Sequence, residues 1–242
     1  MTNLQRLGIL FFAVAYSPLV SAQTLDEIIA KNSEARGGTD NILAIKAAQA
    51  SGTMTMGPGM EAPFAWEWKA PNKFRIDFTI QGQIGTQAFD GNKGWMNMPF
   101  MGKTEPELIP EEQNKDMAQQ SDFHGQLVNY REKGHQVELI GKEEIEGTEV
   151  FKLKITLKDG DVLYSYLDAE HFLEIKQEGH HKRGDTNVVR TTTFGDYKDV
   201  NGVMFPFSMS TSQDGMPGSQ VITLGKIELN VEIDDARFVF PK

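Results

Sequence analysis

The chain has 242 residues, 39% of them hydrophobic, and a formal net charge of -10 at pH 7, so we expect one domain with a sizeable core. The acidic balance argues against nucleic acid, whose binding needs a basic surface, and against adhesion to anionic lipid headgroups. Because the sequence has no cysteine, disulfide bonds and thiolate metal sites are excluded.

Residues 1–22 are typical of a cleaved signal peptide. Arg6 is the only charge before the apolar run from Leu7 to Val20, and Val20-Ser21-Ala22 offers small residues before a cut at Gln23. The run is too short for a comfortable membrane span, and an uncleaved anchor is the less favoured alternative. We expect a mature, soluble chain in an extracytoplasmic space, without a lipid anchor because no cysteine lies beside the cut.

Two short helices are predicted after the leader. Thr24 can accept a backbone hydrogen bond at the start of the first helix, and Arg36-Gly37-Gly38 ends it. The second helix is predicted from Asp40 to Ala47. We expect both helices to close one end of a sheet.

Alternating apolar and polar residues then predict strands through the first half of the chain. Phe64, Trp66 and Trp68 share one face of a strand whose other face carries Ala65, Glu67 and Lys69. Further strands are predicted at Gln49–Met56, Phe74–Ile80, Gly82–Asp90 and Gly94–Met101. The alternation identifies the residues that share a face, but not which face is concave.

Residues 105–133 interrupt the strand pattern. Pro106 and Pro110 stop regular structure, and the charged stretch after them has few apolar residues. We predict two short helices here, inserted between the halves of the sheet. Met117, Phe123 and Leu127 are the candidates for lid residues that contact the concave face.

The stretch from Glu146 to Met209 predicts a meander of at least five antiparallel strands. Apolar residues recur there at every second position, and tight-turn sequences such as Asp159-Gly160 and Asn201-Gly202 separate the runs. A last strand is predicted from Gln220 to Ile233. The pattern predicts a mainly β, single-domain protein of about eleven strands, and a sheet of that size curls.

Large apolar residues concentrate on these strands and have two interpretations. They form either a pocket for acyl chains or another apolar ligand, in a cavity that a curved sheet encloses, or an ordinary core. The candidates for ligand binding are Phe64, Trp66, Trp68, Phe74, Ile76, Phe78, Trp95, Met96, Met98, Phe205 and Phe207.

No metal, cofactor or catalytic site is predicted. His180 and His181 lie near Glu178 and Asp185, but neighbouring residues of a strand point to opposite faces, so a solvated hairpin is favoured over a metal site. The sequence contains no G-x-S-x-G motif, no H-E-x-x-H motif and no Gly-rich phosphate loop after a strand. Catalytic residues that converge from distant strands stay possible in principle.

A series of short motifs in a fixed order resembles the outer-membrane lipoprotein-sorting proteins of the LolA-like superfamily. The motifs are Gly37-Gly38, Gly52-Thr53-Met54, Ala70-Pro71-Asn72-Lys73-Phe74-Arg75, Phe89-Asp90-Gly91-Asn92-Lys93-Gly94-Trp95, Tyr166-Leu167-Asp168-Ala169-Glu170, Phe194-Gly195-Asp196-Tyr197 and Asn201-Gly202-Val203-Met204-Phe205-Pro206. The resemblance implies an incomplete antiparallel barrel with helices over its concave apolar face, in the periplasm of a Gram-negative bacterium. It also implies an arginine that holds the lid closed, for which Arg75 and Arg190 are the strand candidates.

The resulting hypothesis is a soluble periplasmic carrier that binds acyl chains of lipoproteins or other lipids without an enzymatic step. The alternative is an envelope scaffold that uses the same curved sheet to bind a protein partner. A lipid-directed hydrolase is the third hypothesis, and it would need convergent polar residues in the cavity.

Overall fold

The computed structural model describes residues 23–56, 59–183 and 186–241. The predicted leader, residues 1–22, and Asp185 of the predicted hairpin lie outside the described residues. None of the helices in the described ranges is long and apolar enough to cross a membrane.

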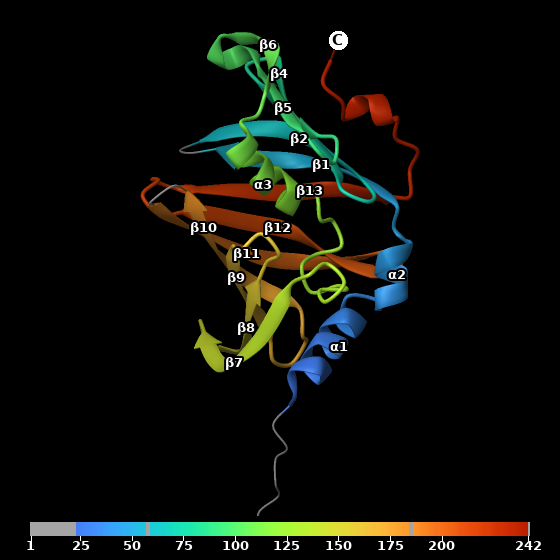
Figure 1. Cartoon of the computed structure of the whole chain (residues 1–242), viewed down its shortest axis with the longest axis vertical. Coiled ribbons are helices and arrows are strands. Elements are labelled where there is room, and N and C mark those ends of the chain that lie inside the picture. Colours follow the sequence, from blue (N-terminus) through green and yellow to red (C-terminus); the bar gives the residue numbers. More distant parts are fainter. Residues whose placement is uncertain (1–22, 57–58, 184–185, 242) are drawn as a thin grey trace, which may run out of the picture.

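A single sheet of thirteen antiparallel strands dominates the described structure (Figure 1). Each strand pairs with its sequence neighbours, except that β1 pairs with both β2 and β13 and so joins the two halves, while β6 and β7 are the two edges. The strands are β1 (Ala47–Met56), β2 (Met60–Lys69), β3 (Lys73–Ile80), β4 (Gln83–Phe89), β5 (Gly94–Met98), β6 (Lys103–Leu108), β7 (Gln136–Ile145), β8 (Thr148–Thr156), β9 (Val162–Asp168), β10 (Glu174–Arg183), β11 (Thr186–Val200), β12 (Val203–Gln213) and β13 (Ser219–Leu229). The open half-barrel is therefore confirmed, with more strands than the sequence predicted.

Strand pairing follows the predicted alternation. Trp66 lies opposite Ile76 on β3 and Ala50 on β1, so the apolar faces of three neighbouring strands coincide. The two-residue turn of Asn201 and Gly202, with φ angles of 53° and 84°, joins β11 to β12 as the Asn-Gly signal predicted. The predicted meander corresponds to β8 through β12.

Three α-helices and two single 3-10 turns, η1 (Pro99–Met101) and η2 (Asp235–Arg237), accompany the described sheet. In α1 (Leu25–Ala35), Thr24 and Glu27 form a reciprocal capping box, which confirms the predicted start. The helix α2 (Thr39–Ala44) is shorter than predicted, because Ala47 already pairs with Lys69 in the sheet. Both helices lie together at one end of the sheet (Figure 1).

The region 105–133 differs from the prediction of two helices. Its first part is the edge strand β6, and one helix, α3 (Glu111–Gln120), follows Pro110, while turns occupy the rest of the segment up to residue 134. Pro106 lies within β6, and an edge strand tolerates a proline because only one of its sides must donate ladder hydrogen bonds. Figure 1 shows α3 lying across the sheet rather than continuing it.

Apolar residues form two clusters on the concave side. The larger cluster lies between α2, α3 and the strands β1–β5, β12 and β13, and includes Phe64, Phe74 and Met117. The second lies between α1 and β7–β9, where Leu153 and Ile155 are completely buried. The helices and the segment 121–134 therefore cover the concave face of the sheet, as predicted.

The C-terminal segment, residues 231–241, packs against the convex face of the first half. Phe238 is completely buried there, and Trp95 donates its indole N–H to the Phe238 carbonyl at 2.8 Å. Arg237 donates to Glu67 at 2.8 Å and to Asp77 at 3.1 Å, and Arg75 donates to the Arg237 carbonyl at 2.8 Å. These contacts fasten the segment across β2–β5.

We expect the Phe238→Ala substitution to lower the free energy of unfolding by about 3 to 5 kcal/mol, because it removes a fully buried ring and leaves a cavity. Val239→Ala is the control, since Val239 is 44% exposed and its truncation should cost no more than about 0.5 kcal/mol. Urea denaturation measures both values. Equal midpoints for the two variants would contradict this role of the C-terminal segment.

Candidate functional site

A cavity of about 610 Å³ lies between the concave face and the C-terminal end of α3. Its walls come from β1–β5 on one side and from β11–β13 on the other, and Gln120 contributes from α3. Met216, in the turn between β12 and β13, lines the cavity and is 64% exposed, so the cavity opens to solvent at this turn.

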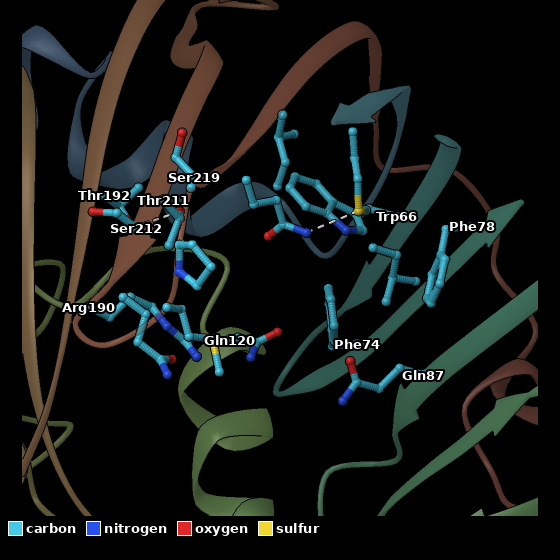
Figure 2. Close-up of a pocket in the computed structure, with 18 of the residues that line it drawn as sticks. Trp66, Phe74, Phe78, Gln87, Gln120, Arg190, Thr192, Thr211, Ser212 and Ser219 are labelled. Atoms are coloured by element: carbon cyan, nitrogen blue, oxygen red, sulfur yellow. Dashed lines mark hydrogen bonds between the residues drawn. The ribbon is translucent and has the colours of Figure 1, made fainter. Parts of the chain in front are cut away.

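One side of the cavity is apolar. Trp66, Phe74, Ile76 and Phe78 line it together with Met54, Met98 and Ile222. The rings of Phe64, Trp66 and Trp68 form a contiguous row, with centroids 4.7 and 5.2 Å apart. Figure 2 shows Trp66, Phe74 and Phe78 on the same side of the cavity.

The structure brings most of the predicted ligand-binding residues together. Five of them line the cavity: Trp66, Phe74, Ile76, Phe78 and Met98. Five others, Phe64, Trp68, Met96, Phe205 and Phe207, belong to the apolar cluster beneath and beside it. The even-numbered face of β2 and β3 is therefore the concave one, which strand alternation alone did not reveal.

Trp95 lies apart from this set. It pairs with Ala88 on β4, whereas the adjacent Met96 pairs with the cavity residue Gln87, so the two side chains of β5 point to opposite faces. Trp95 is 4% exposed on the convex side, where the ring of Phe240 lies 6.3 Å away and the Arg75 guanidinium 5.5 Å away. Its contacts are with the C-terminal segment rather than with the cavity.

The predicted lid residues all contact the concave side. Met117 of α3 is 1% exposed within the larger apolar cluster. The Phe123 ring lies 5.2 Å from Trp68 and 5.6 Å from Phe205, which bridges the two halves of the sheet. Leu127 packs in the second cluster, beneath α1.

The other side of the cavity is polar, and sequence analysis did not predict it. Arg190 and Thr192 of β11, Thr211 and Gln213 of β12 and Gln220 of β13 line it. Thr192 and Thr211 are opposite each other in the ladder, and their hydroxyl oxygens are 2.9 Å apart. Arg190 and Thr192 share a strand face with Phe194, so the alternation in β11 could have placed them on the same face. A face with an arginine and a threonine does not resemble the wall of an apolar pocket, however.

Asp161, which immediately precedes β9, connects α3 to the second half of the sheet through hydrogen bonds. Its side chain is almost fully buried and accepts hydrogen bonds from Lys115 at 2.8 Å and Gln119 at 2.9 Å, both on α3. His181 of β10 lies 3.1 Å away through Nδ1. Burial alone raises the pKa of Asp161, but the hydrogen bonds from Lys115, Gln119 and His181 outweigh it and lower the pKa to about 2.

The same cluster contains three groups with metal-ligand chemistry. Candidate ligand atoms of Asp116, Asp161 and His181 lie within 4.8 Å of one another. The Lys115 ammonium, however, already supplies a positive charge to the most buried carboxylate of the group. The arrangement therefore satisfies Asp161 with protein donors, and His181 pairs with Asp161 rather than facing solvent as the sequence predicted.

An arginine outside the strands contacts the segment after α3. Arg36, at the end of α1, donates to the His124 carbonyl at 3.1 Å, beside a smaller cavity of about 170 Å³ that Glu174 and Tyr197 also line. Burial lowers the pKa of Arg36 and raises the pKa values of Glu174 and Tyr197. Of the two strand candidates, Arg75 binds Asp77 on the convex side and Arg190 lines the larger cavity.

These groups equip the larger cavity for binding. Its described lining offers aromatic rings, amides, hydroxyls and one guanidinium, with no histidine or carboxylate that would serve as a general base. Apart from Gln87 of β4, the polar strand residues stand opposite the apolar wall rather than around a common reacting point. A ligand with an apolar part and a polar part matches this division.

We expect the stabilising effect of Asp161 to be lost as the pH falls from about 4 to about 2, because the folded pKa lies below the ordinary value of 3.8. Asp161→Asn should therefore cost roughly 2 kcal/mol of unfolding free energy at neutral pH and reduce the further loss in acid. Glu228→Gln, which breaks an exposed pair with Lys226, should cost no more than about 1 kcal/mol. Parallel stability curves for wild type and Asp161→Asn below pH 5 would contradict the assignment.

Comparisons with known proteins agree on the fold. A DUF1329 family protein from Desulfovibrio piger has a TM-score of 0.62 and 14% identity, covering 87% of this chain and 97% of its own. A LolA superfamily protein from Nitrosomonas europaea has a TM-score of 0.59 and 16% identity, and the match covers 90% of this chain and 98% of that protein. A putative outer membrane lipoprotein-sorting protein domain from Vibrio parahaemolyticus has a TM-score of 0.58 and 13% identity. The match covers 88% of this chain and 94% of that domain.

Identities this low show similarity of fold alone. A comparison with curated protein sequences found no match. A family model whose description is "Uncharacterized protein" matches residues 83–240, which is more than half of the chain and includes α3, Arg190 and most of the sheet. The chain therefore belongs to the family that this model describes and has the fold of the LolA superfamily.

Proposed function

We propose that this protein is a carrier that binds acyl chains of lipoproteins or other lipids in its concave cavity and moves them between membranes without a catalytic step. We place it in the periplasm, after removal of residues 1–22. The observation that carries the proposal is the cavity of about 610 Å³, bordered by an aromatic wall and partly covered by α3. This volume is in the range of about 300 to 1,000 Å³ typical of small-molecule sites.

The energetics of acyl binding fit such a site. Each methylene that leaves water contributes about 0.8 kcal/mol, so a chain that places several methylenes against Trp66, Phe74 and Phe78 gains useful affinity. The lining methionines, Met54 and Met98, adapt their shape to a flexible chain. Release requires that the ligand leave past the exposed turn at Met216 or that α3 move away.

A scaffold for a protein partner is the alternative, and the state of the concave face separates the two. The half of the sheet under α1 is filled by its own side chains, as a scaffold needs. Between β1–β5 and β11–β13 an open cavity remains, which a scaffold does not need and a carrier does.

Native mass spectrometry of the mature chain, residues 23–242, purified gently from a periplasmic extract, tests the carrier. We expect a bound amphiphile near a one-to-one ratio, which lipid extraction of the same sample then identifies. A ligand-free mass, together with no uptake of an added fatty-acyl probe, would contradict the carrier and favour the scaffold.

A pair of tryptophan substitutions locates the site. Thr211 lines the cavity, so Thr211→Trp should fill part of it and reduce binding of a fatty-acyl probe at least tenfold. Thr223 is exposed on the adjacent strand and pairs with Thr53, one position from the cavity residue Met54, so it points to the convex face. Thr223→Trp is therefore the matched control, and equal binding by both variants would place the site elsewhere.

A further inference from the structure

The cavity contains one charged residue among the described residues that line it, Arg190 on β11. The other polar lining groups are amides and hydroxyls, and no lining carboxylate balances the guanidinium. In the described parts of the chain, the Arg190 side chain has no hydrogen bond or ion pair with another residue. Figure 2 shows it extending from its strand toward Gln120 at the end of α3.

A guanidinium offers five N–H donors and no acceptor, so its charge and donors need an external partner when a ligand displaces water from the cavity. The nearby groups add further donors. Gln220 donates to the thioether of Met54 at 3.1 Å, a weak acceptor, and Trp66 Nε1 is buried without a partner among the described residues. Arg190 and Trp66 thus leave N–H donors at the cavity without an acceptor among the described residues, and a ligand with acceptor oxygens complements them.

We propose that the cavity binds an anionic single-chain amphiphile, with its acyl chain along Trp66, Phe74 and Phe78 and its carboxylate or phosphate at Arg190. The inference rests on the proposed carrier function and names the ligand class for the same site. A planar guanidinium pairs with either acid through two parallel hydrogen bonds. The volume of about 610 Å³ suits one chain with its headgroup.

The net charge of the protein makes this local arrangement selective. At -10, the molecule as a whole repels anionic membrane surfaces, so an acidic headgroup gains attraction only where Arg190 is close and partly shielded from solvent. The cation therefore acts on a single ligand molecule inside the cavity rather than on a bilayer surface. This separates ligand recognition from non-specific adhesion.

Displacement of the neutral dye N-phenylnaphthylamine from the mature protein measures the preference. The competitors share one acyl chain and differ in headgroup: palmitic acid, palmitoyl lysophosphatidic acid and neutral monopalmitoylglycerol, all used below their aggregation concentrations. We expect an acidic competitor to bind roughly tenfold or more tightly than the neutral one, as charge-assisted hydrogen bonds imply. The stronger of the two acids identifies the headgroup as carboxylate or phosphate.

Substitutions assign the preference to its residue. Arg190→Gln should abolish the preference and leave monopalmitoylglycerol binding within about twofold, whereas Arg190→Lys should retain part of it. Lys226→Gln makes the same charge change on β13 at a position that is exposed and does not line the cavity, and it should leave the preference intact. Thermal unfolding of each variant checks that it is folded.

The outcomes separate this inference from the function on which it rests. Equal binding of acidic and neutral competitors by the wild type, or an equal loss of all of them in Arg190→Gln, overturns the headgroup assignment and leaves the carrier standing. The absence of dye and competitor binding in the wild type overturns both.

Discussion

The concave apolar face of the sheet is the constraint on which the rest of the structure depends. Thirteen antiparallel strands curl, and the side chains that gather inside the curve are stable in water only where other elements cover them. The helix α1 covers β7–β9, while α2, α3 and Phe123 cover β1–β5 and part of β12. A cavity exists where this cover ends, between the tip of α3 and the turn that follows β12.

Two parts of the sheet therefore differ in how their concave faces are filled. The concave face of β7 to β9 is filled by its own side chains and those of α1, and residues such as Leu153, Ile155 and Leu167 are fully buried. The cavity lies between β1–β5 and β11–β13, and the convex face of β2–β5 is reinforced by the C-terminal segment. The halves meet where β1 pairs with β13, and Gly52 is needed there because a Cβ atom would lie 2.0 Å from the Thr223 carbonyl oxygen.

Sequence reasoning predicted the parts of this fold that depend on local pattern. Alternation placed Trp66, Phe74 and Phe78 on one face, and the Thr24 cap and the Asn201-Gly202 turn were confirmed, because each depends on a few neighbouring residues. Parity separates Trp95 from Met96 and Met98 on β5, but it does not say which of the two faces is concave, so the predicted set contained residues of both faces. The polar wall was missed because Arg190, Thr211 and Gln220 come from three strands and converge only in the folded sheet.

The interactions that attach α3 to the sheet are polar, whereas the strands beneath it are held by a shared apolar core and a hydrogen-bond ladder. Among the described side chains of α3, Met117 alone is buried. The helix is attached to the sheet mainly by the hydrogen bonds from Lys115 and Gln119 to Asp161 rather than by a broad apolar surface. The strands beneath are held by a continuous ladder and a shared core, so they contribute to global stability, whereas an element with so few buried contacts belongs to the low end of local stability. Because α3 borders the cavity through Gln120, we expect a change in the contacts of α3 to alter access to the cavity without unfolding the sheet.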